Sequence, residues 1–193
     1  MIANAPAPLL AQDWRQRFRR PPRFSWARNV RPPSREAQTA LNLICDVAGL
    51  ERTITLYQAD VQRGFAAFAT TKRGRRYIVY DPVAVPFPPG TISWDSMWVM
   101  AHEVAHHMAG HNFRRDIPEK HEELEGDRIA GGLLYKLGAS EAQALSRFSS
   151  NRPDSRTHPS DHKRREETRD GWLLAQRVAR RERALREQSQ ISD

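Results

Sequence analysis

The sequence has a single cysteine, Cys45, in 193 residues. An internal disulfide and a metal site made only of thiolates are therefore excluded, so any metal ion must be held by histidines and carboxylates. Long apolar runs are also lacking, because no uncharged stretch approaches the roughly 18 residues that span a bilayer. Pro6 and Pro8 interrupt the apolar stretch near Met1, which no Lys or Arg precedes, so a secretory signal is disfavoured. We expect a cytoplasmic protein without a membrane span.

Basic side chains are concentrated at the two ends of the chain, whose formal net charge is +8. Residues 1–35 carry eight arginines against Asp13 alone, giving +7, whereas residues 36–150 sum to −2 and residues 151–193 to +3. A basic arm can bind nucleic acid through phosphate contacts. Prolines interrupt this arm, however, and no zinc-finger, glycine-loop or RNA-recognition motif accompanies it. Nucleic acid is therefore a disfavoured partner, and the sequence does not determine the oligomeric state.

The chain is expected to contain one folded domain and two tails. Residues 1–33 are rich in Pro and Arg and predict an irregular basic arm, whose aromatic side chains can dock on the domain. These aromatic residues are Trp14, Phe18, Phe24 and Trp26. Residues 34–178 carry the periodic apolar pattern of a folded domain, and residues 179–193 indicate a charged C-terminal tail.

Apolar periodicity and capping residues predict several helices and a few short strands. Helices are predicted at 34–48, 93–109, 116–137, 140–148 and 161–188, and strands at 53–58, 65–70 and 76–80. Ser34 and Gly49 are typical N-cap and C-cap residues for the first helix. The helix at 93–109 is apolar on nearly every side, which indicates a central position. The strands indicate a small antiparallel sheet beside it. The predicted class is α+β, mostly helical.

The central helix contains His102, Glu103 and His106 in the order His-Glu-Val-Ala-His. Residues four apart lie on one face of a helix, so both imidazoles can reach one ion, whereas Glu103 is turned by about 100° and can meet a water on that ion. The alternative is a pair of core histidines satisfied by neighbouring groups. That alternative is costly, because each imidazole in so apolar a helix needs a polar partner, and a metal ion supplies both. The pattern therefore predicts metal binding.

A third ligand is expected from the following helix. The chain lacks the additional histidine of the metzincin pattern, so a carboxylate is favoured. The candidates are Glu119, Glu122, Glu123 and Glu125. Glu123 shares a helix face with Asp127 and with apolar residues that indicate burial, whereas the face of Glu125 looks solvated. We favour Glu123, with Glu122 as the runner-up, and expect Asp127 to accept the free ring N–H of a ligand histidine, with His102 as the first choice.

Three motifs follow one another along the chain: His-Glu-Val-Ala-His from His102, Glu-Leu-Glu-Gly-Asp-Arg-Ile-Ala from Glu123, and Thr157-His158-Pro159. Together they resemble gluzincin metallopeptidases of the CAAX prenyl protease type, a family that includes bacterial membrane quality-control proteases and soluble periplasmic relatives. The resemblance covers residues 36–175 and implies a zincin-like metallopeptidase domain with one zinc ion per chain. It also implies that Ala66, Ala67 and Phe68 lie in a substrate-binding edge strand, with Ala66 in place of the family's Asn, and that His158 lies near the zinc.

The leading hypothesis is a zinc-dependent endopeptidase that acts on a protein or peptide. Glu103 is the expected general base, and His158 is expected to assist in catalysis or to regulate it. The neighbouring His107 and His111 are expected either to support the ligands or to face solvent. Zinc is preferred because two imidazoles and one carboxylate with an open position suit it, although manganese or cobalt can substitute.

Two alternatives stay open from the sequence. One is a regulatory peptidase that cleaves a single repressor or antitoxin, since a small chain with this His-Glu-x-x-His start suits that role. The other is a non-catalytic, zinc-stabilised module that binds nucleic acid through its basic arm. Glu103 argues against the second alternative, because a purely structural metal site needs no base beside the metal.

Overall fold

The computed structural model describes residues 21–61, 66–111, 119–148, 150–155 and 158–191 of the chain. Its elements, in chain order, are β1 (Ala27–Arg31), α2 (Arg35–Ala48), β2 (Ile54–Val61), β3 (Ala67–Lys72), β4 (Arg75–Tyr80), α3 (Trp94–Ala109), α4 (Glu119–Lys136), α5 (Glu141–Ala144) and α6 (Asp161–Ile191). About 53% of the described residues are helical, and the strands form one small sheet. The predicted α+β class with a helical majority is confirmed.

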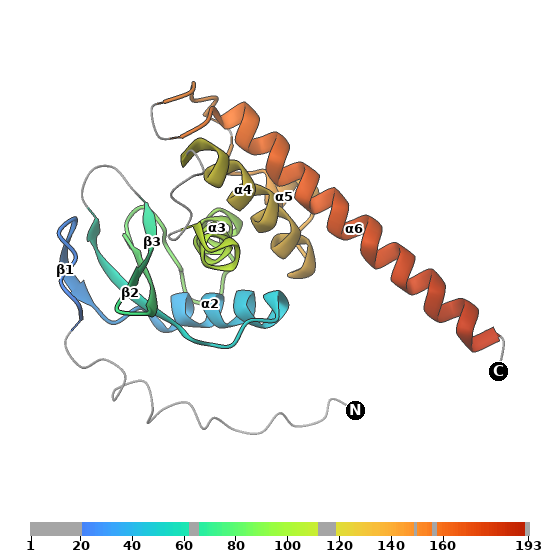
Figure 1. The fold of residues 1–193 in the computed structure, drawn as a ribbon, viewed down its shortest axis with the longest axis horizontal. Coiled ribbons are helices and arrows are strands. Elements are labelled where there is room, and N and C mark those ends of the chain that lie inside the picture. The colour runs from blue at the N-terminus through green and yellow to red at the C-terminus, as the bar shows by residue number, and fades with distance from the viewer. Residues whose placement is uncertain (1–20, 62–65, 112–118, 149, 156–157, 192–193) are drawn as a thin grey trace.

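Helix α3 lies at the centre of the fold. Its N-cap Ser93 accepts a hydrogen bond from the Ser96 backbone, and Gly110 ends it with a φ of 69°, a left-handed conformation that glycine adopts without strain. Most of its side chains are buried. Figure 1 looks nearly along α3 and shows it between the sheet and α4, with α2 packed on a third side. The predicted position and ends of this helix are confirmed.

The sheet is mixed, so the prediction of an antiparallel sheet was wrong in one pairing. Its strand order is β1-β2-β4-β3, and β2 pairs with β4 in parallel, whereas the other two pairings are antiparallel. From β2 the chain passes to the far edge as β3 and returns through Arg73 and Gly74, both at positive φ, to insert β4 next to β2. The apolar pattern of a strand does not specify its neighbour, so the sequence could not show this order.

Residues 27–31 were predicted to belong to an irregular arm, but they form the edge strand β1. Phe24 is buried there against Tyr57 and Tyr77, on the face of the sheet that points away from α3. Trp26 contacts Phe68, with 4.8 Å between the ring centroids. These two aromatic residues of the arm therefore pack on the domain, which is what orders β1; Trp14 and Phe18 lie outside the described residues.

Helices α4 and α6 cross at very close range. A Cβ atom added to Gly131 would lie 1.9 Å from the Thr168 carbonyl oxygen, and one added to Gly171 would lie 1.8 Å from that of Arg128. Only glycine permits this approach of two backbones. Because α4 and α6 are in contact along this line, the N-terminal half of α6 is fixed relative to α4.

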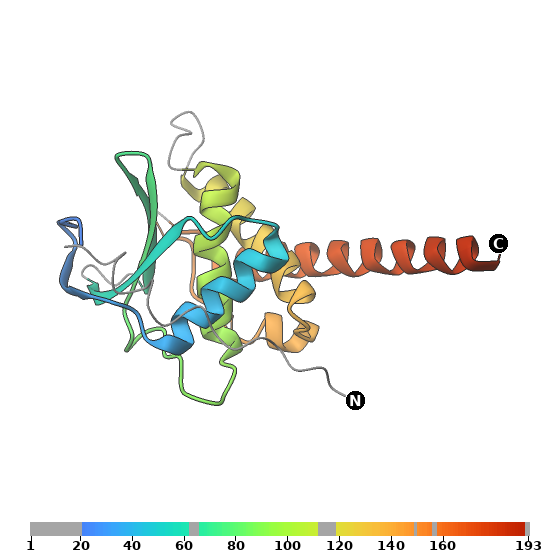
Figure 2. The same cartoon turned by 90° about the horizontal axis from the view of Figure 1, so that it is seen from below.

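Two predicted helices differ in extent from those observed. The segment 140–148 is helical only in α5, whose Ser140 forms a capping box with Gln143, and it continues as turns. Helix α6 continues to Ile191, and its last residues are exposed, so the predicted tail at 179–193 is helical as far as it is described. Figures 1 and 2 both show the C-terminal half of α6 extending away from the other elements. Among the described residues, no helix has the length and apolar character needed to cross a membrane.

Candidate metal centre

The three predicted ligand residues come together between α3 and α4. The Nε2 atoms of His102 and His106 are 3.0 Å apart, and the carboxylate oxygens of Glu123 lie 3.4 Å from each of them. All three ligand atoms lie within 4.8 Å of one another. Donor atoms held 2.0–2.2 Å from a tetrahedral zinc would be roughly 3.3–3.6 Å apart. The two Glu123 distances match this spacing and the two imidazole nitrogens lie slightly closer together, so the donor set fits zinc.

Asp127 supports the first of these histidines. Its Oδ1 lies 2.9 Å from Nδ1 of His102, and its side chain is fully buried. Burial alone would lower the pKa of His102, but the carboxylates of Asp127 and Glu123 outweigh burial and raise that pKa to about 10. An imidazole whose Nδ1–H faces a carboxylate presents Nε2 to the metal position. The contact predicted between Asp127 and His102 is thus present.

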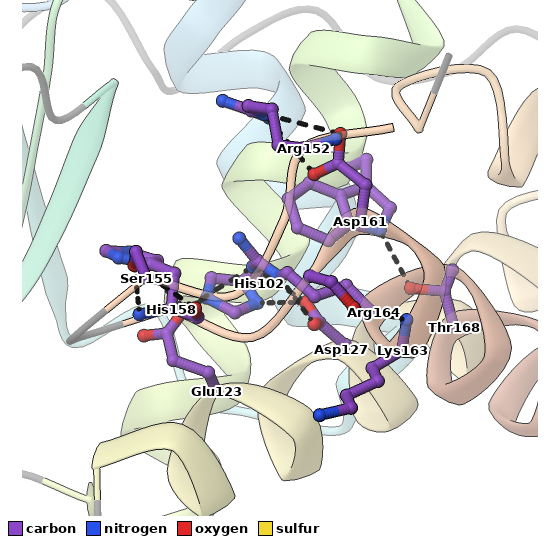
Figure 3. A network of polar contacts seen from close by, with 12 residues as sticks. His102, Glu123, Asp127, Arg152, Ser155, His158, Asp161, Lys163, Arg164 and Thr168 are labelled. Carbon is purple, nitrogen blue, oxygen red and sulfur yellow. Dashed lines mark hydrogen bonds and ion pairs between the residues drawn. The ribbon is translucent and has the colours of Figure 1, made fainter. Parts of the chain in front are cut away.

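Arg164, at the start of α6, compensates the buried charge of Asp127. Its Nε and one terminal nitrogen donate to the two oxygens of Asp127 at 2.8 and 2.9 Å, and it also approaches Glu123 at 3.4 Å. Figure 3 shows Arg164, Asp127 and His102 in one connected network. Sequence reasoning missed Arg164. A buried Asp127 does call for a cation, but several Lys and Arg residues of α6 are candidates from sequence, and only the helix crossing selects one.

A second chain of contacts supports His106. Its Nδ1 lies 2.7 Å from Nδ1 of His111, and Nε2 of His111 lies 3.2 Å from Glu125. His111 therefore lies beside a candidate ligand, which agrees with the expectation that it supports the ligands and not with the alternative that it faces solvent. From its position in the sequence, Glu125 is expected to lie on a solvated face of its helix. Its side chain is only 33% exposed, so this face is partly covered. Little in the sequence indicates that Glu125 contacts this site, because charged residues share its helix face.

His107 is buried and serves the fold. Its Nε2 donates to the Tyr77 carbonyl at 3.0 Å and so joins α3 to β4. Burial lowers the pKa of His107 to about 4, which keeps the ring neutral at physiological pH. Neither expectation for His107, support of a ligand or exposure to solvent, describes this contact.

A cleft of about 640 Å³ opens on the three ligand residues. The predicted substrate strand lines one wall through Ala66, Ala67 and Phe68, and Glu103 and Glu122 also face the cleft. Strand β3 is the last strand of the sheet, so among the described residues its outer edge has no strand partner. Glu103 is 7% exposed, and Glu122 is not among the three residues whose ligand atoms converge.

His158 lies at the cleft and close to the ligands. Its Nε2 is 3.7 Å from Glu123, and its backbone N–H donates to Oγ of Ser155 at 2.9 Å, an arrangement visible in Figure 3. Burial lowers the pKa of His158, and the nearby Glu123 does not reverse this. The expected proximity to the site is therefore present for His158, whereas Thr157 of the same motif lies outside the described residues.

No protein-family model matches the sequence, and neither the curated proteins nor the solved structures contain a match. The function must therefore be inferred from the residues of the site. Two imidazoles and a carboxylate with supporting acidic partners are typical of a catalytic zinc centre, in which three protein ligands leave one position open.

Proposed function

We propose that this protein is a zinc-dependent endopeptidase with a zincin-like domain of the gluzincin type. The observation that carries the proposal is the convergence of His102, His106 and Glu123 at the spacing of tetrahedral zinc ligands. The order of the motifs along the chain adds support through its resemblance to the CAAX prenyl protease type of metallopeptidase. One zinc ion per chain would be held by these three side chains.

Zinc at this position would act as a Lewis acid that lowers the pKa of a water molecule from about 15.7 towards 7 and polarises a peptide carbonyl. Glu103 follows the ligand His102 on α3 and faces the same cleft. Its carboxylate accepts the proton of the attacking water and then delivers it to the leaving nitrogen. His158, whose Nε2 lies 3.7 Å from Glu123, can donate a hydrogen bond to the substrate carbonyl oxygen.

The substrate is expected to bind as an extended chain. The free edge of β3 lines the cleft beside the ligands, and a peptide added to this edge would form main-chain hydrogen bonds with it. Such pairing sets the register of the peptide but leaves the choice of side chains broad. This suits an enzyme that cleaves within unfolded or extended segments.

Metal analysis combined with degradation of an unfolded protein tests the proposal. We expect about one zinc per purified parent chain, hydrolysis that a chelator abolishes, and loss of both zinc and hydrolysis in Glu123→Ala. Glu166→Ala, at an exposed position of α6, is the control and should retain both. Full zinc content in Glu123→Ala would contradict the assignment of Glu123 as a ligand. A parent protein that holds zinc but hydrolyses no peptide bond would favour the non-catalytic module.

A further inference from the structure

Arg147 is a cation of the cleft that has no carboxylate at ion-pair distance among the described residues. Among the residues that the structure describes, three arginines line the cleft: Arg147, Arg152 and Arg164. Arg164 is paired with Asp127, and Arg152 with Asp161 at 3.3 Å. Within the described part of the chain, no carboxylate lies at ion-pair distance from Arg147. Asp95 and Asp161 attract it only from farther away, while burial and the two other arginines lower its pKa.

The position of Arg147 is set by an aromatic residue next to the metal ligands. Its guanidinium lies 5.5 Å from the ring centre of Trp98. The same indole stacks on His102 at 5.1 Å with an interplanar angle of 17°. Trp98 is itself held by a hydrogen bond from its Nε1 to Thr168 and by edge contact with Phe148. The fixed indole ring of Trp98 therefore contacts both this cation and a candidate zinc ligand.

We propose that Arg147 is a substrate-binding residue that receives a carboxylate of the peptide. A guanidinium offers a planar pair of donors that matches a carboxylate, and peptides carry this group on Asp and Glu side chains and at the C-terminus. Successive residues of an extended chain are about 3.3 Å apart. The guanidinium of Arg147 contacts the same indole ring as the candidate ligand His102. A carboxylate bound by Arg147 therefore belongs to a peptide residue within about two or three positions of the cleaved bond. This inference rests on the proposed endopeptidase function, which it narrows to peptides with an acidic group there.

Binding of matched peptides tests the inference without turnover. Fluorescence anisotropy would be measured on the full chain carrying Glu103→Gln, with labelled peptides in which one Glu, or Gln in its place, moves stepwise along an Ala/Ser sequence. We expect about tenfold tighter binding of the Glu peptide at one or two positions, as a charge-assisted hydrogen bond typically provides. A second pair of peptides, one with a free and one with an amidated C-terminus, shows whether Arg147 binds the C-terminal carboxylate or a side-chain carboxylate.

Variants of Arg147 separate recognition from structure. Arg147→Gln should remove the preference for Glu over Gln, and Arg147→Lys, which keeps the charge, should retain part of it. Arg177→Gln on the exposed face of α6 is the matched control and should leave the preference unchanged. If Arg147 were only structural, its loss would weaken both peptides equally, and that result would overturn the inference. Absence of binding by either peptide, or of any preference in the starting protein, would overturn it as well.

The same peptides separate this inference from the proposed function. If the protein with Glu103 intact hydrolyses none of them while the Arg147-dependent preference remains, the endopeptidase proposal fails and the carboxylate site stands. If it hydrolyses the Glu and Gln peptides equally well, the endopeptidase proposal stands and the carboxylate site fails. Arg147→Lys keeps the test valid if Arg147→Gln does not fold.

Discussion

Glu103 and Glu123 face one cleft but are placed for different chemistry. Glu123 lies within 3.4 Å of both candidate ligand nitrogens, which suits a metal ligand. Glu103 is not among the converging ligand atoms and is buried beside them. A carboxylate in that position can take up a proton from a reacting water. The roles of these two residues are therefore separable by mutation.

Glu103→Gln is expected to lower turnover about 10²- to 10⁴-fold, the usual contribution of a general base, while zinc stays near one per chain. The amide keeps the size of the side chain but cannot accept the proton. Initial rates on an unfolded protein and elemental analysis of the same sample measure both effects. Glu122→Gln, which also faces the cleft, is the control and should keep most activity. If Glu103→Gln hydrolyses the substrate as fast as the parent protein, Glu103 is not the general base.

The elements around the site are held by the α4–α6 crossing and by the segment 150–161 that carries His158. Buried Asp161, the first residue of α6, accepts hydrogen bonds from Ser150 Oγ at 2.7 Å and from the Arg152 backbone at 3.0 Å. Figure 3 shows Arg152 beside Asp161, and His158 of the same segment beside Glu123. The geometry of the site therefore depends on contacts made outside it.

Gly131→Ala is expected to destabilise the protein by about 3 kcal/mol, the upper range for overpacking, because its Cβ would lie 1.9 Å from a backbone oxygen of α6. Gly132→Ala is the matched control: its Cβ would meet nothing closer than 3.6 Å, and alanine favours the helix. Urea unfolding measures both. Equal stability of the two variants would show that α4 and α6 do not cross as closely as described.

Asp161 is expected to stabilise the protein at neutral pH but not in acid. Burial alone would raise the pKa of Asp161, but hydrogen bonds from Arg152 and Ser150 outweigh it and hold the pKa below its ordinary value. The folded state thus favours the carboxylate, so its contribution is present above the unfolded pKa of about 3.9 and is lost as pH falls through the folded pKa.

The corresponding variant is Asp161→Asn, compared with the parent by urea unfolding in chelator. It should cost about 1–2 kcal/mol at pH 7, and the difference should shrink as the pH falls below about 4. Asp170→Asn, on an exposed part of α6, should show a much smaller difference at pH 7. A difference for Asp161→Asn that does not change with pH would contradict the assignment of its charge.

For the whole molecule, the site links elements distant in the sequence. The candidate ligands come from α3 and α4, and Arg164 ties them to α6, whose C-terminal half extends away from the domain in Figures 1 and 2. A metal ion that binds the folded chain only would therefore connect α3 to α4 and stabilise the whole domain.

Removal of zinc is expected to lower the melting temperature. Free zinc at 100 times its dissociation constant adds about 2.7 kcal/mol, which corresponds to roughly 5–10 °C for a chain of 193 residues. Thermal unfolding with zinc and with excess chelator measures this shift. Glu123→Ala should show little of it, and a full shift in that variant would mean that zinc acts elsewhere on the chain.

Local patterns in the sequence determined much of this protein. Ser34 and Ser93 as N-caps, and Gly49 and Gly110 as C-caps, set the ends of α2 and α3, because capping depends on neighbouring residues alone. Helical spacing likewise put His102 and His106 on one face and chose Glu123 among four glutamates. These inferences needed only the periodicity of a helix.

Tertiary structure alone decided the rest. The insertion of β4 beside β2, the pairing of Arg164 with Asp127, and the approach of His111 to His106 join residues through non-local contacts. Many partners of the same type are compatible with each pattern, and which one is reached depends on how the elements pack. Arg147 is the clearest case, because only the packed structure shows that Arg152 and Arg164 are paired with carboxylates and that, within the described residues, Arg147 is not.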